Sequence, residues 1–227
     1  MPRLPNKATT ERSERSDEQL GPYAQNRRGL SQKVWRLQQK LYVKAKREPK
    51  FRFYALYDRI YRADVLHDAW CRVAENGGSP GVDGVRVVDL VNDAEALARM
   101  LGDLGESLRA KTYRPSPVKR VYIRKPDGKE RPLGVPTVRD RVAQMAALLV
   151  LEPIFEADFK DCSYGFRPER NAHQAVDEVK QAVSQGRTTV LDADLKSYFD
   201  TIPHDKRMIT LEQRISDGSV LGLIRQW

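Results

Sequence analysis

The chain has 227 residues, a hydrophobic content of 40% and a formal net charge of +9 at pH 7. This composition predicts a soluble, folded chain with one large domain or two small ones. The longest apolar run, Met145 to Leu151, is too short to cross a bilayer, and the amino terminus lacks an apolar signal segment. We therefore expect a cytoplasmic protein without a membrane partner.

The positive charge is concentrated in the first third of the chain. Residues 1–65 contain 16 Lys or Arg against 7 Asp or Glu, whereas the remaining residues contain 24 of each. A basic extension joined to a neutral body is typical of proteins that bind nucleic acid, because each cation that neutralises a phosphate releases counterions. A solvated basic tail with no specific partner is the alternative.

Residues 1–76 are expected to form two regions of this extension. Residues 1–29 are polar and punctuated by Pro and Gly, which predicts a disordered basic tail. Residues 30–76 read as a helical RNA-binding extension, with one helix from Ser31 to Pro49 and a second from Phe51 to Asn76.

The first of these helices is basic and amphipathic. Such a helix suits a membrane surface as well as RNA, but its Trp35 and Tyr42 are also suited to base stacking. The candidate RNA-binding residues are its cations, Lys33, Arg36, Lys40 and Lys44.

A glycine-rich loop at residues 77–84 opens the third region, residues 77–227. It is not a P-loop, because no Gly-Lys-Ser/Thr follows and no strand precedes it. A helix is predicted next, from about Asp93 to Lys111.

A basic β-hairpin is predicted from Ser116 to Val135. Its strands, Ser116–Arg124 and Glu130–Val135, flank an Asp-Gly pair that favours a tight turn. Residues 109–141 contain 11 Lys or Arg against 3 Asp or Glu. Lys125 and Arg131 lie near the turn, where they could bind phosphate oxygens. A solvated basic hairpin is the alternative.

Further helices are expected from Thr137 to Phe159, from Asn171 to about Ser184 and from Pro203 to about Ile215. The chain then reaches Trp227 in what reads as the start of another helix.

Between the second and third of these helices, residues 189–195 have the pattern of a buried β-strand. Asp192 and Asp194 fall on one face, because successive side chains of a strand point to opposite faces. Carboxylates at the end of a strand can hold Mg²⁺, which activates a hydroxyl nucleophile and neutralises charge on a transferring phosphoryl group. An ordinary strand-to-helix turn is the alternative.

Six motifs resemble those of group II intron reverse transcriptase/maturases and occur in the family's order. They are Lys125-Pro-Asp-Gly-Lys-Glu-Arg-Pro-Leu-Gly-Val-Pro136, Asp140-Arg-Val-Ala-Gln144, Leu151-Glu-Pro-Ile-Phe-Glu156, Ser163-Tyr-Gly-Phe-Arg-Pro168, His173, and Asp194 to Asp200. The resemblance covers roughly residues 77–215. It implies an α+β fold, a partial right-hand polymerase with fingers and an incomplete palm.

The resemblance also implies an activity, RNA-directed DNA synthesis on an intron RNA template and a DNA primer from deoxynucleoside triphosphates. Asp194 would bind both Mg²⁺ ions, helped by the backbone carbonyl of Leu195, and Phe199 would exclude a 2′-hydroxyl. Lys125 and Arg131 would bind the triphosphate. Arg167 would contact the template or form a structural ion pair.

The family's second acidic motif, Tyr-Ala-Asp-Asp or close to it, does not occur in these residues. We therefore expect that the 227 residues alone do not polymerise. One alternative is a non-catalytic maturase-like module that binds intron RNA, and another is a genomic remnant without activity. The sequence does not indicate an oligomeric state.

Overall fold

The computed structural model describes residues 20–124, 128, 130–195 and 198–227. At its centre lies α7 (Val138–Glu156), a helix that is buried on most of its circumference. Helices α2 (Gln32–Arg47) and α4 (Ala63–Asn76) pack on α7 along much of their length. One continuous hydrophobic core joins residues from Tyr23 to Leu223, so the core has no break at residue 76.

Pro153 lies inside α7, where a proline removes one backbone hydrogen bond. The N–H that is missing would have donated to the carbonyl of Leu149, four residues earlier. Instead the side chain of Gln38, which is buried in α2, donates to Leu149 O at 2.9 Å. A buried polar side chain thus replaces the lost donor and ties α2 to α7.

The predicted helix from Phe51 to Asn76 is wrong in its first part. Residues 51–56 are not helical, and helix begins only with α3 (Tyr57–Ile60), which is followed by α4. Phe53 instead forms a parallel bridge with Ile215, with its N–H donating to Arg214 O at 2.8 Å. The backbone of this segment therefore pairs with a distant part of the chain rather than with its own next turn.

The carboxyl-terminal residues return to the body as α9 (Tyr198–Thr201), α10 (His204–Glu212) and α11 (Gly218–Ile224). Arg214 is buried between α10 and α11, and it donates to Ala45 O at 2.9 Å and to Glu48 O at 3.2 Å. These carbonyls end α2 and have no helical partner of their own. The guanidinium thus caps α2 and also pairs with Asp158 at 3.0 Å.

Residues 20–29 belong to the packed body, which corrects part of the prediction of a disordered tail. Tyr23, in the short 3₁₀ helix η1 (Gly21–Tyr23), is buried, and Arg28 pairs with Glu152 of α7. The prediction for residues 1–19 lies outside the described residues.

The glycine-rich loop packs against the start of α7. Arg141 donates to Gly77 O at 3.1 Å and also to the carbonyl of Ser79. A Cβ on Gly81 would lie 2.7 Å from Thr137 Cα, which is closer than real atoms approach. The loop therefore serves packing, and it leads into α5 (Val87–Asn92) and α6 (Ala94–Arg109).

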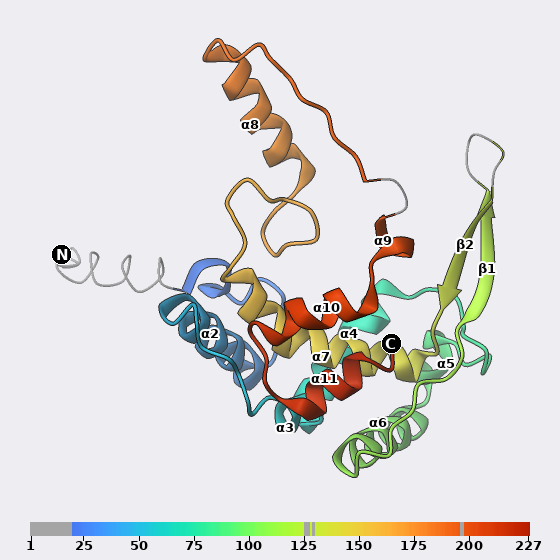
Figure 1. Ribbon diagram of the computed structural model, residues 1–227. Coiled ribbons are helices and arrows are strands. Elements are labelled where there is room, and N and C mark those ends of the chain that lie inside the picture. The colour runs from blue at the N-terminus through green and yellow to red at the C-terminus, as the bar shows by residue number, and fades with distance from the viewer. Residues whose placement is uncertain (1–19, 125–127, 129, 196–197) are drawn as a thin grey trace, which may run out of the picture.

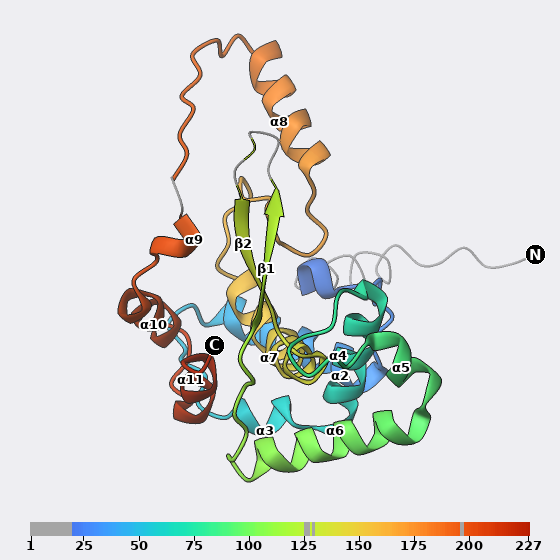
Figure 2. The same cartoon turned by 90° about the vertical axis from the view of Figure 1, so that its right-hand side faces the viewer.

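Two structures project from the same side of this body (Figures 1 and 2). One is the antiparallel hairpin of β1 (Lys119–Arg124) and β2 (Glu130–Val135), the only sheet among the described residues. The hairpin was predicted, but its first strand begins at Lys119 rather than at Ser116. The other, which we call the arch, comprises α8 (Ala172–Ser184) and the extended residues 187–195.

Candidate nucleic-acid and nucleotide site

The register of the hairpin gives it two chemically different faces. Residues directly opposite each other in an antiparallel pair point to the same face, and the next pair points to the other. Ile123 stands opposite Arg131, and Val121 stands opposite Leu133. This face is therefore apolar in its middle, with the guanidinium of Arg131 toward the turn and Lys119, opposite Val135, at the other end.

The other face of the hairpin is cationic and aromatic. It carries Arg120, Tyr122 and Arg124 in a row, all exposed, with Glu130 opposite Arg124. Neither arginine forms an ion pair within the described residues. An exposed aromatic ring between two unpaired guanidinium groups is a suitable surface for single-stranded nucleic acid, because bases stack on the ring and phosphates pair with the cations.

The two residues predicted to bind the triphosphate are not equally described. Arg131 is exposed near the end of the hairpin, in a position open to a ligand. Lys125 lies outside the described residues, so its position relative to Arg131 stays a prediction.

The prediction of a buried β-strand at residues 189–195 is wrong. The segment is extended but pairs with no strand in the described part of the chain, and 81% of Val190 and 92% of Leu191 are exposed. A strand becomes buried only when neighbouring strands satisfy its backbone and another layer covers its side chains. The apolar pattern predicted the extended backbone correctly but not the missing neighbours.

The carboxylates of this segment do not form a metal cage by themselves. Asp192 and Asp194 are both exposed, and Leu195 is 68% exposed. No three acidic, His or Cys side chains gather at one point within the described residues. Mg²⁺ needs several well-placed oxygen ligands, so these residues fit a magnesium site only in part. The side chain of Phe199 lies outside the described part.

The cations of α2 that were predicted to bind RNA are exposed, with one exception. Lys33, Arg36 and Lys40 are exposed, as an interface with RNA requires. Lys44 pairs with Glu48 at 2.6 Å and lies 4.2 Å from the centre of the Phe51 ring, so its charge is already engaged. The expectation of base stacking by Trp35 and Tyr42 is not supported, since Tyr42 is buried and the Trp35 ring donates to Tyr23 O.

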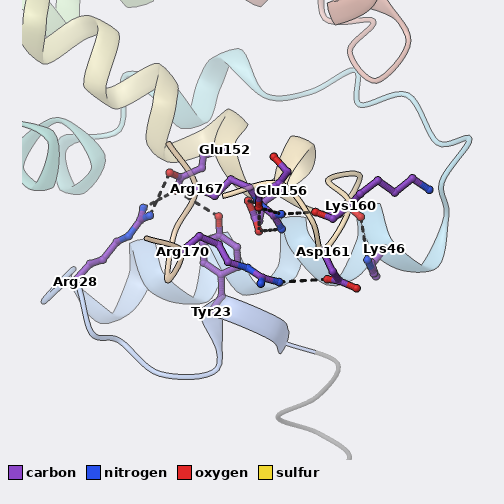
Figure 3. Close-up of polar contacts among 11 residues, drawn as sticks. Tyr23, Arg28, Lys46, Glu152, Glu156, Lys160, Asp161, Arg167 and Arg170 are labelled. Carbon is purple, nitrogen blue, oxygen red and sulfur yellow. Dashed lines mark hydrogen bonds and ion pairs between the residues drawn. The ribbon is translucent and has the colours of Figure 1, made fainter. Parts of the chain in front are cut away.

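Arg167 forms a structural ion pair, which was the alternative to a template contact. Its guanidinium pairs with Glu156 at 2.7 Å, and the two side chains are only 5% and 4% exposed. It also donates to the carbonyls of Lys160 at 2.6 Å and Ser163 at 2.7 Å (Figure 3). The hydrogen bonds that Arg167 donates to Glu156, together with the negative charge of Glu156, outweigh burial and raise the pKa of Arg167. Arg167 thus fixes the loop that leads into α8.

Sequence reasoning missed several residues around this loop. Glu156 and Glu152 lie near the end of α7, where Glu156 forms an ion pair with Arg167 and Glu152 forms one with Arg28 (Figure 3). Phe166 is fully exposed with a φ of 55°, an unusual conformation for a bulky residue. Arg120, Tyr122 and Arg124 could have been found from their alternation along the predicted strand.

Comparisons with known proteins show which family the sequence resembles. Residues 123–227 match the family described as reverse transcriptase (RNA-dependent DNA polymerase). Over 174 residues the chain is 34% identical to the group II intron-encoded protein LtrA of Lactococcus lactis subsp. cremoris. This match covers 76% of the chain and 28% of LtrA. The chain belongs to the group II intron reverse transcriptase/maturase family. It carries an amino-terminal portion of that family's sequence.

Two further proteins are similar to this reverse transcriptase/maturase chain. Protein YkfC of Escherichia coli (strain K12) is 41% identical over 194 residues, 83% of this chain and 50% of that protein. Nuclear intron maturase 1, mitochondrial, of Arabidopsis thaliana is 36% identical over 89 residues, 39% of this chain and 12% of that protein. The chain thus spans half of YkfC and less than a third of LtrA. No helix in the described part could span a membrane.

Proposed function

We propose that this chain provides the fingers and the first part of the palm of an RNA-directed DNA polymerase that acts in the cytoplasm on group II intron RNA. Its partners are an RNA template, a DNA primer and deoxynucleoside triphosphates. The observation that carries the proposal is the exposed hairpin, whose row of Arg120, Tyr122 and Arg124 is suited to single-stranded nucleic acid. Family resemblance supplies the chemistry of the reaction.

In this proposal the two faces of the hairpin bind different ligands. The row with Tyr122 holds the template strand, and the opposite face directs Arg131 at the triphosphate of the incoming nucleotide. Lys125 is the second residue that we propose binds this triphosphate. The exposed Lys33, Arg36 and Lys40 of α2 extend the contact with intron RNA.

Asp194 is the proposed metal-binding carboxylate, with Leu195 O beside it. Of the two magnesium ions that Asp194 would help to hold, one would activate the primer 3′-hydroxyl for attack on the α-phosphate, and the other would stabilise the pyrophosphate that leaves. Because the described residues gather too few ligands, we propose that the 227 residues alone do not polymerise.

Binding of single-stranded RNA at several salt concentrations tests the role of the hairpin. Each phosphate contact contributes about 0.7 to the slope of log K against log [salt], so the double variant Arg120→Gln, Arg124→Gln should lower the slope by about 1.4 and weaken binding. The matched control is Arg99→Gln on α6, an exposed arginine far from the hairpin in sequence, which should change neither. An unchanged slope in the double variant would contradict the proposal.

Primer extension with Mg²⁺ tests the catalytic part. We expect no templated synthesis by the purified 227-residue chain. Synthesis that persisted after Asp194→Ala would exclude Asp194 as the metal-binding carboxylate. Selective binding of one intron RNA over a scrambled RNA, unaffected by Asp194→Ala, would favour the maturase-like binding module instead.

A further inference from the structure

The hairpin of β1 and β2 projects from the body without a core of its own. No residue of either strand is buried. A two-stranded hairpin with both faces in solvent is marginally stable by itself, because no buried apolar face holds it. Its direction must therefore be set at its base, where β2 leads into the start of α7 (Figure 1).

We call the residues that join the hairpin to the body its legs, residues 113–118 before β1 and residues 136–137 after β2. The legs contain Pro115, Pro117 and Pro136. A proline fixes its own φ at about −65°, and it also restricts the preceding residue to an extended backbone. The legs are therefore stiff, so the contacts that hold them set the direction of the whole hairpin.

Asp140 in the first turn of α7 holds both legs with one buried carboxylate. Its Oδ1 accepts from the hydroxyl of Tyr113 at 2.7 Å. Its Oδ2 accepts from the N–H of Ser116 at 3.0 Å and from the hydroxyl of Thr137 at 2.7 Å. The residue is only 1% exposed, and hydrogen bonds to a buried carboxylate are strong.

This carboxylate does more than the start of a helix requires. The N–H of Asp140 already donates to Thr137 Oγ1 at 3.1 Å, which caps α7 in the usual way. The bonds to Tyr113 and Ser116 reach a different part of the chain, the leg before β1. Asp140 thus ties the two legs to each other as well as to the helix.

Arg141, the next residue, connects the second leg with the glycine-rich loop. Its Nε donates to Pro136 O at 3.1 Å, while its other nitrogens donate to the carbonyls of Gly77 and Ser79. Gly81 of the same loop lies so close to Thr137 that a Cβ on it would be 2.7 Å from Thr137 Cα. The loop therefore clamps the second leg against the start of α7.

We propose that Asp140 and Arg141 are positioning residues that set the direction of the hairpin, and that they thereby place the row of Arg120, Tyr122 and Arg124 on the template strand. Neither residue contacts the nucleic acid in this proposal, because each acts through the legs. The placement of the row on a template rests on the proposed function, whereas the control of direction does not.

The distance between two spin labels measures the direction of the hairpin. The labels are attached through Leu133→Cys in β2 and Glu75→Cys in α4, both exposed, in a chain that also carries Cys71→Ser and Cys162→Ser. Asp140→Asn replaces one accepting oxygen by an N–H₂ group, and Arg141→Lys loses the fork that reaches several carbonyls. Each variant should broaden the distribution of distances about twofold, because one anchor of the stiff legs is lost.

An unchanged distribution in both variants would overturn the proposal. Arg141 is only partly buried, so Arg141→Lys keeps the test decisive if Asp140→Asn does not fold.

The control Val150→Ala separates positioning from stability. Val150 is buried in the same helix, ten residues or about 15 Å beyond Asp140 along α7. This variant should destabilise the body and leave the distribution of distances as in the parent chain. Broadening equal to that of Asp140→Asn would mean that any loss of stability frees the hairpin, and it would overturn the specific role of Asp140 and Arg141.

Binding of single-stranded RNA connects the direction of the hairpin with its function. Both variants keep Arg120 and Arg124, and neither lowers the net positive charge of the chain. Misplacement of the row should nevertheless lower the slope of log K against log [salt] by up to about 1.4, which corresponds to two lost phosphate contacts.

The two measurements distinguish this inference from the proposed function. Broadened distances with an unchanged salt slope would support the positioning residues and contradict binding of RNA by the row. A lower slope with unchanged distances would overturn the inference, because the hairpin would then have kept its direction.

Discussion

Helices α7 and α8 both carry valine and alanine at helical spacing, but only α7 is buried. Twelve residues of α7 lose their solvent contact, because α2 and α4 pack along it, whereas α8 has no buried residue. The spacing of apolar side chains thus predicts that a helix forms and which of its faces is apolar. Burial depends on the elements that are present to cover that face.

The largest effect on stability is expected at Glu156, where the body meets the loop that leads into α8. Glu156→Ala leaves the buried guanidinium of Arg167 without its partner, so it should lower the free energy of unfolding by about 3–5 kcal/mol. Urea denaturation measures the change. Asp161→Ala is the control, since it removes an exposed ion pair with Arg170 and should cost less than about 1 kcal/mol. Equal effects would mean that the loop is not anchored by the buried pair.

A valine-to-alanine substitution made once in α7 and once in α8 tests whether the two helices differ in burial. Val150→Ala removes methyl groups from a fully buried side chain of α7 and should cost about 2 kcal/mol. Val179→Ala in α8 should change the stability of the free chain by less than about 0.5 kcal/mol, because that side chain is exposed. Thermal and urea unfolding measure both. A cost at Val179 comparable to that at Val150 would show that α8 is covered in solution.

A smaller effect, dependent on pH, is expected at Asp217, which joins the carboxyl-terminal residues to the body. Its carboxylate accepts from the N–H groups of Leu56 and Tyr57 at 2.8 and 2.9 Å, and from those of Ser219 and Val220 in α11. Burial favours the neutral acid, but these four donors outweigh it and hold the pKa of Asp217 below its usual range.

The direction of the pH effect follows from that lowered pKa. The stabilisation is present above the pKa of an unfolded aspartate, about 3.9, and is lost as the pH falls through the lower folded value. Asp217→Asn should cost about 1 kcal/mol at neutral pH and should lose less stability than the parent chain between pH 5 and pH 2. The urea concentration at the midpoint of unfolding, measured across this pH range, tests the prediction. If the midpoints of the variant and of the parent chain fell in parallel with pH, the prediction would be contradicted.

Much of the local structure could be predicted from the sequence. Asn171 and Gln174 signal the start of α8, the alternating pattern of residues 119–135 predicts the hairpin, and the helical pattern gives α2 and α7. These signals act between residues that are close in sequence. The non-helical residues around Phe53 could not be predicted, because their partner is Ile215, which lies far along the chain.

The candidate site was predictable in its residue types but less so in its geometry. The basic hairpin follows from charge and alternation, and Arg131 is exposed as a phosphate contact requires. The role of Arg167 depended on whether a buried carboxylate faced it, and Glu156 does. The exposure of Asp194 reflects the absence of neighbouring strands from the described residues, which no pattern within residues 189–195 could reveal.

The bridge between Phe53 and Ile215, together with the cap that Arg214 places on α2, sets an order of events during synthesis. A ribosome that adds about 5–20 residues per second delivers Ile215 roughly 10–30 s after Phe53. Until then the carbonyls at the end of α2 have no guanidinium, and the backbone of Phe53 has no partner. Helices α2 and α4 can pack on α7 earlier, but the end of α2 and the strand-like residues around Phe53 reach their final contacts only when the last tenth of these residues has been made.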